Sequence, residues 1–401
     1  MSLKALVVCP PGLEPLLAAE IRALGGDPGS PIHGGVPVEV SQAQLYAYNL
    51  RLRVATRVLL RLGNGFVDGP QSLHRLLDSM DWTRYCSGCS VVVTATSHSS
   101  TLFHTGLVEE AAMELIAKRA AVVPQGPDVP EQRVVIRIDH DRAVVSIDSS
   151  GDRLDRRGYR LFGAKAPLRE TLAAALVLSS GWDPRTPLVD PFCGSGTIAI
   201  EAAMAAQGLA PGRNRRFAFQ DWPSFTRSAW KQAKAGAAAA ERPSMTPVIV
   251  AGDRDGGAIE ATLANAERAG VAVDARHGSF SSLEMPSGRG AIVTNPPYGV
   301  RVGDQRSLRD LYDSFGRWLP ERAPGWTITL LDADRTLTSR LGLPLTERIR
   351  TANGGIDVSV MHGVVRDPSQ AAGAPPAKPA HRASVISVPR SGDRDPRPGQ
   401  L

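Results

Sequence analysis

The sequence of 401 residues has little cysteine, few aromatic residues and no long apolar run. Four cysteines are too few for a disulfide scaffold, and scarce cysteine is typical of proteins from a reducing compartment. No apolar segment approaches the roughly 20 residues that a membrane-spanning helix needs. The N-terminus meets Pro10, Pro11 and Glu14 too early to contain a signal-peptide core. We therefore expect a cytoplasmic protein that does not interact with membranes.

The cysteines and histidines do not predict a metal centre. Cys86 and Cys89 form a C-x-x-C pair, but a structural zinc site needs a second pair of ligands at matching spacing. His74, His98 and His104 have no neighbours in the sequence that complete a catalytic triad or a metal site. We expect no metal.

Composition favours a folded protein with more than one domain. Hydrophobic residues make up 42% and charged residues 21% of the chain, which is typical of globular proteins. The length exceeds what one ordinary core accommodates, so two or three domains are expected. The net charge of +6 leans toward polyanionic partners, although many basic proteins bind no nucleic acid.

The first 150 residues contain two α+β units. In residues 1–62, short apolar strands alternate with helical stretches, the last of which is expected from Ser41 to about Leu62. In residues 63–150, an alternating strand and a helix near 106–121 precede two strands joined at His140 and Asp141. Residues 151–167 form a linker.

From residue 168 to 365 the pattern changes to short apolar strands that alternate with helices. The strands are PLVD, PVIVAG, AIVTN and WTITLLD, and the helices are expected over 171–180, 198–207, 258–269 and 308–319. Runs that are apolar on both faces suit a parallel sheet covered by helices. The fold class is therefore α/β, a doubly wound, mostly parallel sheet preceded by α+β units. The Pro- and Ala-rich segment 366–401 is predicted to be disordered.

A glycine loop follows the first of these strands and opens a helix, in the sequence D-P-F-C-G-S-G-T at 190–197. Glycines allow close approach of a ligand and positive φ angles, and the helix N-terminus offers free N–H groups. Asp253 ends the next strand, where an acid can accept hydrogen bonds from ribose hydroxyls or cap the following helix. Asp255 is better placed as the cap.

The third site is the turn Asn295-Pro296-Pro297-Tyr298-Gly299 after a buried strand. Two prolines stiffen the turn, so that the Asn295 side-chain oxygen and the Pro296 carbonyl can accept both hydrogens of an amino group. Drawing these hydrogens out of the base plane makes the amine nitrogen nucleophilic, and Tyr298 offers a face for stacking. The turn therefore predicts a nucleic-acid amine as substrate.

The glycine loop at 190–197 and the turn at 295–299 resemble motifs I and IV of class I SAM-dependent amino-methyltransferases. The chain more closely resembles the THUMP-domain guanine-N2 RNA methyltransferases, in particular the bacterial 23S ribosomal RNA enzymes. The likeness extends over residues 1 to about 365 and includes segments 12–14, 99–106, 157–160, 166–170 and 210–213. It implies a Rossmann-like catalytic domain preceded by ferredoxin-like and THUMP units, with S-adenosyl-L-methionine (SAM) as cofactor.

The resemblance also implies roles for residues. The cofactor-binding residues are Asp190, Phe192, Gly194, Gly196, Thr197, Asp253, Arg254, Ser279 and Phe280. The catalytic residues are Asn295, Pro296, Pro297 and Tyr298. Ser279 departs from the family, which usually has an acid there to meet the adenine amino group, so SAM affinity is expected to be lower.

Basic residues suggest where RNA binds. They gather near the linker and in the insertion that contains Phe217, Phe219 and Trp222, and the RNA-binding set is Arg157, Arg160, Lys165, Arg213, Arg215 and Arg216. An ordinary solvated surface rich in charged residues would have the same sequence pattern. We expect residues 1–150 to bind RNA, and we expect the SAM site to form in a chain that lacks these residues.

The expected reaction is methylation of a guanine N2 in 23S rRNA. Three alternatives stay open: the same chemistry on tRNA, adenine-N6 methylation of DNA, and a catalytically silent RNA-binding protein.

Overall fold

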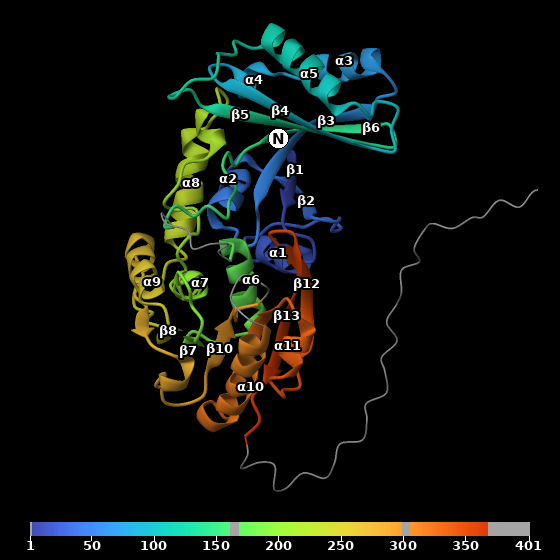
Figure 1. Ribbon diagram of the computed structural model, residues 1–401. Coiled ribbons are helices and arrows are strands. Elements are labelled where there is room, and N and C mark those ends of the chain that lie inside the picture. The colour runs from blue at the N-terminus through green and yellow to red at the C-terminus, as the bar shows by residue number, and fades with distance from the viewer. Residues whose placement is uncertain (1, 161–167, 299–304, 368–401) are drawn as a thin grey trace, which may run out of the picture.

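The computed structural model describes residues 2–160, 168–298 and 305–367, and these form two stacked lobes (Figure 1). The upper lobe holds an N-terminal sheet whose outer face is covered by helices, and the lower lobe is an α/β domain. The expected disorder of the C-terminal segment and the predicted contact of Lys165 with RNA concern residues outside the described ranges, apart from Arg366 and Asp367.

The N-terminal sheet contains six strands in the order β2-β1-β3-β6-β5-β4. They are β1 (Leu3–Val8), β2 (Gly35–Val40), β3 (Arg57–Phe66), β4 (Ser90–His98), β5 (Glu131–Asp139) and β6 (Arg142–Asp148). Its helices are α1 (Glu14–Ala23), α2 (Gln42–Arg51), α3 (Pro70–Asp78), α4 (Thr83–Cys86) and α5 (Thr105–Arg119). All neighbouring strands are antiparallel except β4 and β5.

The helix expected from Ser41 to Leu62 ends at Arg51, and the part of that segment from Arg57 onward belongs to β3. β3 pairs with β1 on one side and β6 on the other, and its Val58 and Leu60 are buried. Pairing along both edges outweighs the weak helical spacing of the segment. The boundary expected at residue 62 therefore falls inside a strand, and one sheet runs through both α+β units.

The β5–β6 hairpin turns at His140 and Asp141, as the sequence predicts. Both residues have positive φ angles, of 50° and 58°. Two successive residues of this kind make the turn whose twist matches the right-handed twist of the flanking strands.

The second sheet has the order β12-β13-β11-β10-β7-β8-β9, in which the strands from β11 to β9 are parallel. Its strands are β7 (Leu188–Asp190), β8 (Ile249–Asp253), β9 (Asp274–His277), β10 (Ala291–Thr294), β11 (Thr327–Asp332), β12 (Thr346–Asn353) and β13 (Ile356–Val364). Its helices are α6 (Glu170–Ser180), α7 (Thr197–Ala206), α8 (Arg227–Ala238), α9 (Gly256–Ala269), α10 (Gln305–Arg322) and α11 (Arg335–Ser339), with short 3₁₀ turns η1 (Ala218–Asp221) and η2 (Phe280–Ser282). The predicted Rossmann-like fold is confirmed.

Chain order and strand order reverse between β7 and β10 in this sheet. After β7 the chain builds β8 and β9 on one side, then returns to add β10 and β11 on the other. In open α/β sheets the crevice beyond the carboxyl ends of such strands is the usual ligand site. The loop at 190–197 and the turn at 295–298 both leave the sheet at this point.

An insertion between α7 and β8 fastens the two lobes together. Its helix α8 packs along α2, and the Phe219 ring stacks on Tyr46 with ring centroids 4.1 Å apart (Figure 1). Arg53, after α2, donates a hydrogen bond to the Leu209 carbonyl of the lower lobe. None of the helices in the described ranges is long and apolar enough to cross a membrane.

Candidate active site

A cavity of about 440 Å³ lies at the carboxyl ends of β7, β8 and β10. Both sequence motifs contribute to its wall. The lining residues are Leu168, Asp190, Pro191, Phe192, Cys193, Gly194, Ser195, Thr197, Ile198, Asp253, Arg254, Asp255, Ser279, Phe280, Asn295, Pro297, Ser307, Leu308 and Leu311.

The glycine loop is held by both neighbouring elements. Gly194 and Gly196 have φ angles of 54° and 78°, which favour glycine. The Gly194 N–H donates to the Asp253 carboxylate at 2.9 Å, and the Thr262 hydroxyl donates to the Gly194 carbonyl at the same distance. The loop is therefore a rigid shelf at the cavity.

The two glycines have different surroundings. A Cβ at Gly194 would meet nothing within 4 Å, whereas a Cβ at Gly196 would lie 2.6 Å from the Thr262 Cγ2 atom of α9. Gly194 lines the cavity and Gly196 does not. Gly196 is thus needed for the close packing of the loop on α9, while Gly194 leaves space for a ligand.

Asp253 and Asp255 divide the roles that the sequence left open. The Asp255 side chain accepts from the Gly257 N–H and caps α9, as predicted. Asp253 lines the cavity, and its two oxygens accept from the N–H groups of Gly194 and Asp255. A carboxylate oxygen has two lone pairs, so Asp253 retains capacity for hydroxyl donors from a ligand.

Asp190 is a buried acid with one free oxygen. Its Oδ1 accepts from the Thr294 hydroxyl at 2.6 Å and from the Phe192 N–H at 3.2 Å. Its Oδ2 is buried without a hydrogen-bond partner. Burial, the largest cause, raises the pKa of Asp190 to about 7, and nearby Asp253 adds to the effect. A cationic ligand would relieve this cost.

Asn295, which also lines this cavity, has a second acceptor without a partner. Its Oδ1 is buried and has no hydrogen-bond partner. Asn295 follows Thr294, whose hydroxyl bonds to Asp190, so the two motifs are joined directly. The sequence predicted these residues separately, and the structure brings them to one wall.

The rest of the turn is arranged around Asn295. Pro297 lines the cavity, whereas Pro296 is buried and neither it nor Tyr298 is among the lining residues. Asn353, at the end of β12, donates to the Tyr298 hydroxyl at 3.2 Å. This positioning contact was not predicted, because Asn353 is 55 residues away in the sequence.

The cavity fits a SAM molecule in chemical terms. Phe192 lies 5.5 Å from Phe280 between ring centroids, so two aromatic side chains wall the cavity on the side of Ser279. The two unpartnered oxygens, of Asp190 and Asn295, suit a cation and a hydrogen-bond donor respectively. Ser279 is exposed, and its hydroxyl also accepts from the Ser281 N–H.

Several lining residues outside the two motifs were missed by the sequence analysis, among them Ile198 on the first turn of α7. Leu168 precedes α6, while Ser307, Leu308 and Leu311 lie on the first turns of α10. The helical spacing of its leucines predicts α10, but this spacing does not reveal which face of the helix meets the cavity.

The arginines predicted to contact RNA differ in exposure. The Arg157 side chain is only 2% exposed, and it donates to the Leu154 and Arg53 carbonyls and pairs with Glu201. Its predicted contact with RNA is therefore corrected, since its guanidinium is enclosed and fully used. Arg160 is partly buried and donates to the Thr197 hydroxyl at 2.7 Å.

The insertion requires a similar correction. Arg215 donates to four backbone carbonyls in segment 150–156, and its pKa is lowered to about 10 by burial. Phe217, Phe219 and Trp222 are buried, so they cannot stack on bases as their position beside the arginines had suggested. Arg213 and Arg216 are exposed, although Arg213 donates to the Ala269 carbonyl and Arg216 pairs with Asp221.

The histidines differ from expectation in one place. His98, Asp139 and His140 bring potential ligand atoms within 4.8 Å of one another, which the sequence did not reveal because β4 and β5 are paired only in the fold. The His140 and His98 rings hydrogen-bond to Asp139, and these contacts account for the cluster.

Cys86 and Cys89 are buried, with the pKa of Cys86 raised to about 12 mainly by burial.

Known proteins share this architecture over nearly the whole chain. A sequence-family model described as an RMKL-like methyltransferase domain matches residues 157–361, and one described as the RlmL ferredoxin-like domain matches residues 4–59. The chain is 32% identical over 363 residues to a candidate RNA methyltransferase of Synechocystis sp., covering 87% of this chain and 94% of that protein.

Two solved structures are similar throughout. A candidate methyltransferase, SMU.472, was crystallised with SAH and is 29% identical, with a TM-score of 0.81, covering 90% of this chain and 98% of its own. A predicted N6-adenine-specific DNA methylase from Listeria monocytogenes is 30% identical, with a TM-score of 0.82, covering 90% and 96%.

Proposed function

The chain belongs to the RMKL-like family of SAM-dependent RNA methyltransferases, and we propose that it methylates the exocyclic N2 amine of a guanine in 23S ribosomal RNA. The family establishes methyl transfer to RNA with SAM as cofactor. The choice of atom and of RNA is our proposal. The amine rests on one observation, the buried and unpartnered Asn295 oxygen beside the Asp190 cavity, while guanine N2 and 23S rRNA follow from the resemblance of the sequence to the bacterial 23S rRNA enzymes.

The amine is the chemical group that this oxygen suits. The nitrogen of a base amine is planar, because its lone pair is delocalised into the ring. An acceptor that holds its hydrogens out of the ring plane makes the lone pair available. We propose that Asn295 Oδ1 accepts one hydrogen and that the carbonyl of Pro296, which does not itself line the cavity, accepts the other when the base is bound. A buried acceptor without a partner costs about 1–3 kcal/mol, and a bound amine would remove that cost.

The remaining residues position the two reactants. SAM supplies a methyl group on a sulfonium. Asp190 would lie beside this positive charge, Asp253 would hold the ribose hydroxyls, and Phe192, Phe280 and Ser279 would enclose the adenine. Gly194, Thr197 and Arg254 complete the shelf. Because the residues act by orientation and electrostatics, most of the rate enhancement would come from placing amine and methyl in line.

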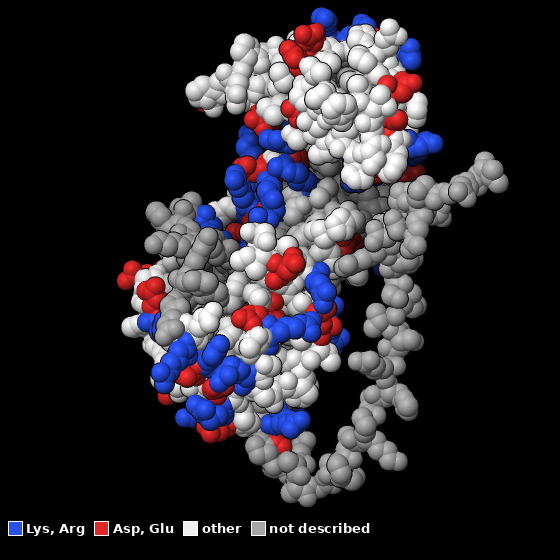
Figure 2. Space-filling model, turned by 45° about the vertical axis from the view of Figure 1, so that its right-hand side comes forward, with Lys and Arg blue, Asp and Glu red and all other residues white. Residues whose placement is uncertain are grey.

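RNA would be held by the upper lobe, in which we place the THUMP unit, and by the junction of the lobes. Figure 2 shows Lys and Arg side chains gathered at the waist between the lobes. This cluster of basic side chains favours binding of a polyanion that extends from the upper lobe to the cavity. Tyr298, fixed by Asn353, provides a surface on which the target base can stack.

Adenine N6 is the second candidate for the methylated atom. It is also a planar amine, and Asn295 would accept its hydrogens equally well. The Listeria structure described as a predicted N6-adenine-specific DNA methylase shares the fold. The same site acting on tRNA would use identical contacts.

Mass spectrometry of nucleosides tests the proposal. We would separate 23S rRNA, 16S rRNA, tRNA and DNA from cells without the gene and from cells complemented with the wild type or Asn295→Ala. The proposal expects N2-methylguanosine to be lost from 23S rRNA alone and restored only by the wild type. A loss confined to tRNA or to N6-methyladenine would select the corresponding alternative and refute the proposed substrate.

A further inference from the structure

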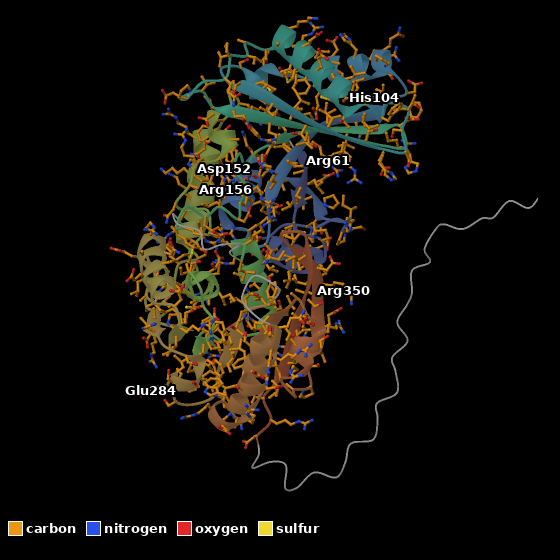
Figure 3. All side chains as sticks on the ribbon, viewed as in Figure 1. Arg61, His104, Asp152, Arg156, Glu284 and Arg350 are labelled. Carbon is orange, nitrogen blue, oxygen red and sulfur yellow. The ribbon has the colours of Figure 1, made fainter. Side chains whose placement is uncertain are left out.

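A second cavity, of about 620 Å³, lies where the two lobes meet. Its wall combines the segment after β6, the start of α6 and the beginning of the insertion. Six arginines and three acids line it together with one glycine, and these are Arg156, Arg157, Arg160, Arg169, Arg215, Arg216, Asp152, Asp155, Glu170 and Gly158. Figure 3 shows Asp152 and Arg156 at this junction, beside α8. The excess of arginines is not balanced by the acids.

Two of the arginines build the wall and are not available to a ligand. Arg157 is enclosed and bonded to the Arg53 and Leu154 carbonyls. Arg215 is bonded to four carbonyls of segment 150–156. These contacts fix the backbone that carries Arg156, and they prepare the site before a ligand arrives.

Two other arginines keep their hydrogen-bonding capacity. Arg169 forms no hydrogen bond or ion pair through its guanidinium with any described residue. Arg156 pairs only with Asp152, and both side chains are about 70% exposed, at 72% and 69%. An ion pair that is exposed to this degree is weak, so a phosphate can replace Asp152 as the partner of Arg156.

Arg160 connects this cavity to the SAM cavity. It lines the junction cavity, while its guanidinium donates to the Thr197 hydroxyl and the Leu168 carbonyl, at 2.7 and 2.8 Å. Thr197 and Leu168 line the SAM cavity. The Arg160 Nε atom is buried without a partner. The Arg160 side chain therefore contacts both sites, and its Nε–H group remains without an acceptor.

We propose that the junction cavity binds a backbone phosphodiester of the RNA substrate through Arg156 and Arg169, next to Arg160. The inference rests on the proposed function and extends it by naming a contact of the substrate. Guanidinium groups bind phosphate oxygens with paired hydrogen bonds, so the unpaired Arg169 and the weakly paired Arg156 suit a phosphate in this partly enclosed site. Because Arg160 adjoins both sites, the bound phosphate would lie close to the nucleotide that enters the SAM cavity.

The salt dependence of RNA binding tests this site on the full chain. The probe is a fluorescein-labelled, single-stranded oligoribonucleotide from the RNA that is methylated, measured by anisotropy over a range of KCl concentrations. The slope of log K against log salt is negative, and each lost phosphate contact reduces its magnitude by roughly 0.7. Arg169→Gln and Arg156→Gln should each reduce the magnitude of the slope by about this amount, with SAM affinity unchanged.

The matched control is Arg185→Gln, which removes an equal charge. The Arg185 side chain is 80% exposed, pairs with Asp183, and lies before β7 at the opposite end of that strand from the cavity. It should leave the slope unchanged. Asp152→Asn should act in the opposite direction and tighten RNA binding, since it frees Arg156. A thermal melt of each variant checks that the fold is retained.

The outcomes separate this inference from the proposed function. If Arg156→Gln and Arg169→Gln keep the wild-type slope while methyl transfer continues, the phosphate site is refuted and the proposed function stands. If the magnitudes of the slopes fall as expected but the wild type methylates no guanine N2, the site stands as an RNA contact and the proposed reaction fails.

Discussion

Asp190 and Asn295 each leave a buried oxygen without a hydrogen-bond partner at the same cavity. Unpartnered acceptors are rare in protein interiors because each one costs stability. Their presence on two adjacent motifs is therefore best explained by a ligand that satisfies both. Under the proposed function, Asp190 would face the charge of the cofactor and Asn295 would face the amine.

The pKa of Asp190 gives a prediction about pH. With a pKa of about 7, the acid is mostly neutral at pH 6 and mostly ionised at pH 8. Only the ionised form attracts a cation, so the affinity for SAM should fall as the pH decreases through 7. Isothermal titration calorimetry at both pH values would measure this. Asp190→Asn should bind SAM more weakly at pH 8 and lose the pH dependence, whereas Ser279→Ala should keep it. An unchanged pH profile in Asp190→Asn would contradict the assignment.

Single residues also show where sequence reasoning succeeds and fails. The motif at 190–197 and the turn at 295–298 could be placed because strand ends in a parallel sheet meet at one edge. Exposed arginines could not be distinguished from buried ones, because the sequence does not reveal whether a guanidinium points outward, as in Arg156, or into the protein, as in Arg157. Arg169, whose guanidinium has no partner among the described residues, was missed for the same reason.

At the scale of elements, the glycine loop depends on its contact with α9. The two glycines therefore predict two different effects of the same substitution. Gly196→Ala combines a positive φ with a Cβ only 2.6 Å from Thr262, so it should destabilise the fold by about 1–3 kcal/mol or more. Gly194→Ala has a similar φ but open space, so it should destabilise less and weaken SAM binding more directly.

Urea unfolding and calorimetry on both variants would compare these effects. The control is Gly69→Ala, at a glycine whose φ is extended and whose Cβ would meet nothing within 4 Å. Greater loss of stability in Gly194→Ala than in Gly196→Ala would contradict the packing argument.

The elements that the sequence predicted correctly are the buried ones with a strong pattern. β7, β8, β10 and β11 are apolar on both faces and were identified. β9 and β12 are polar strands at the two edges of the sheet, and their sequences carry no such pattern. β3 was mistaken for a helix because its pairing with β1 and β6, 49 or more residues away, cannot be read locally.

At the scale of the whole molecule, the two lobes share an interface that a division of labour by domain does not suggest. Tyr46 and Phe219 stack across it, the Trp222 indole donates to Gln132, and Arg53 bonds to carbonyls of the lower lobe. The expectation that the SAM site forms without residues 1–150 conflicts with this interface. Removing those residues would expose buried rings and leave Arg157 without the Arg53 carbonyl.

Deletion of residues 1–150 should therefore lower the melting temperature of the remaining domain and increase its binding of an apolar dye, besides reducing RNA affinity. Circular dichroism, dye fluorescence and SAM titration of the truncated chain would show this. A truncated chain that melts cooperatively at the full-length temperature and binds SAM normally would refute the structural role of the interface.

The most direct test of the central claim is single-turnover methyl transfer by Asn295→Ala, with SAM affinity measured on the same preparation. Removing one group that bonds to the reacting centre in the transition state costs on the order of 10²–10³ in rate. We predict a rate loss of this size with a dissociation constant for SAM close to that of the wild type. Transfer at nearly the wild-type rate would show that Asn295 does not hold the amine, and the proposed site would be wrong.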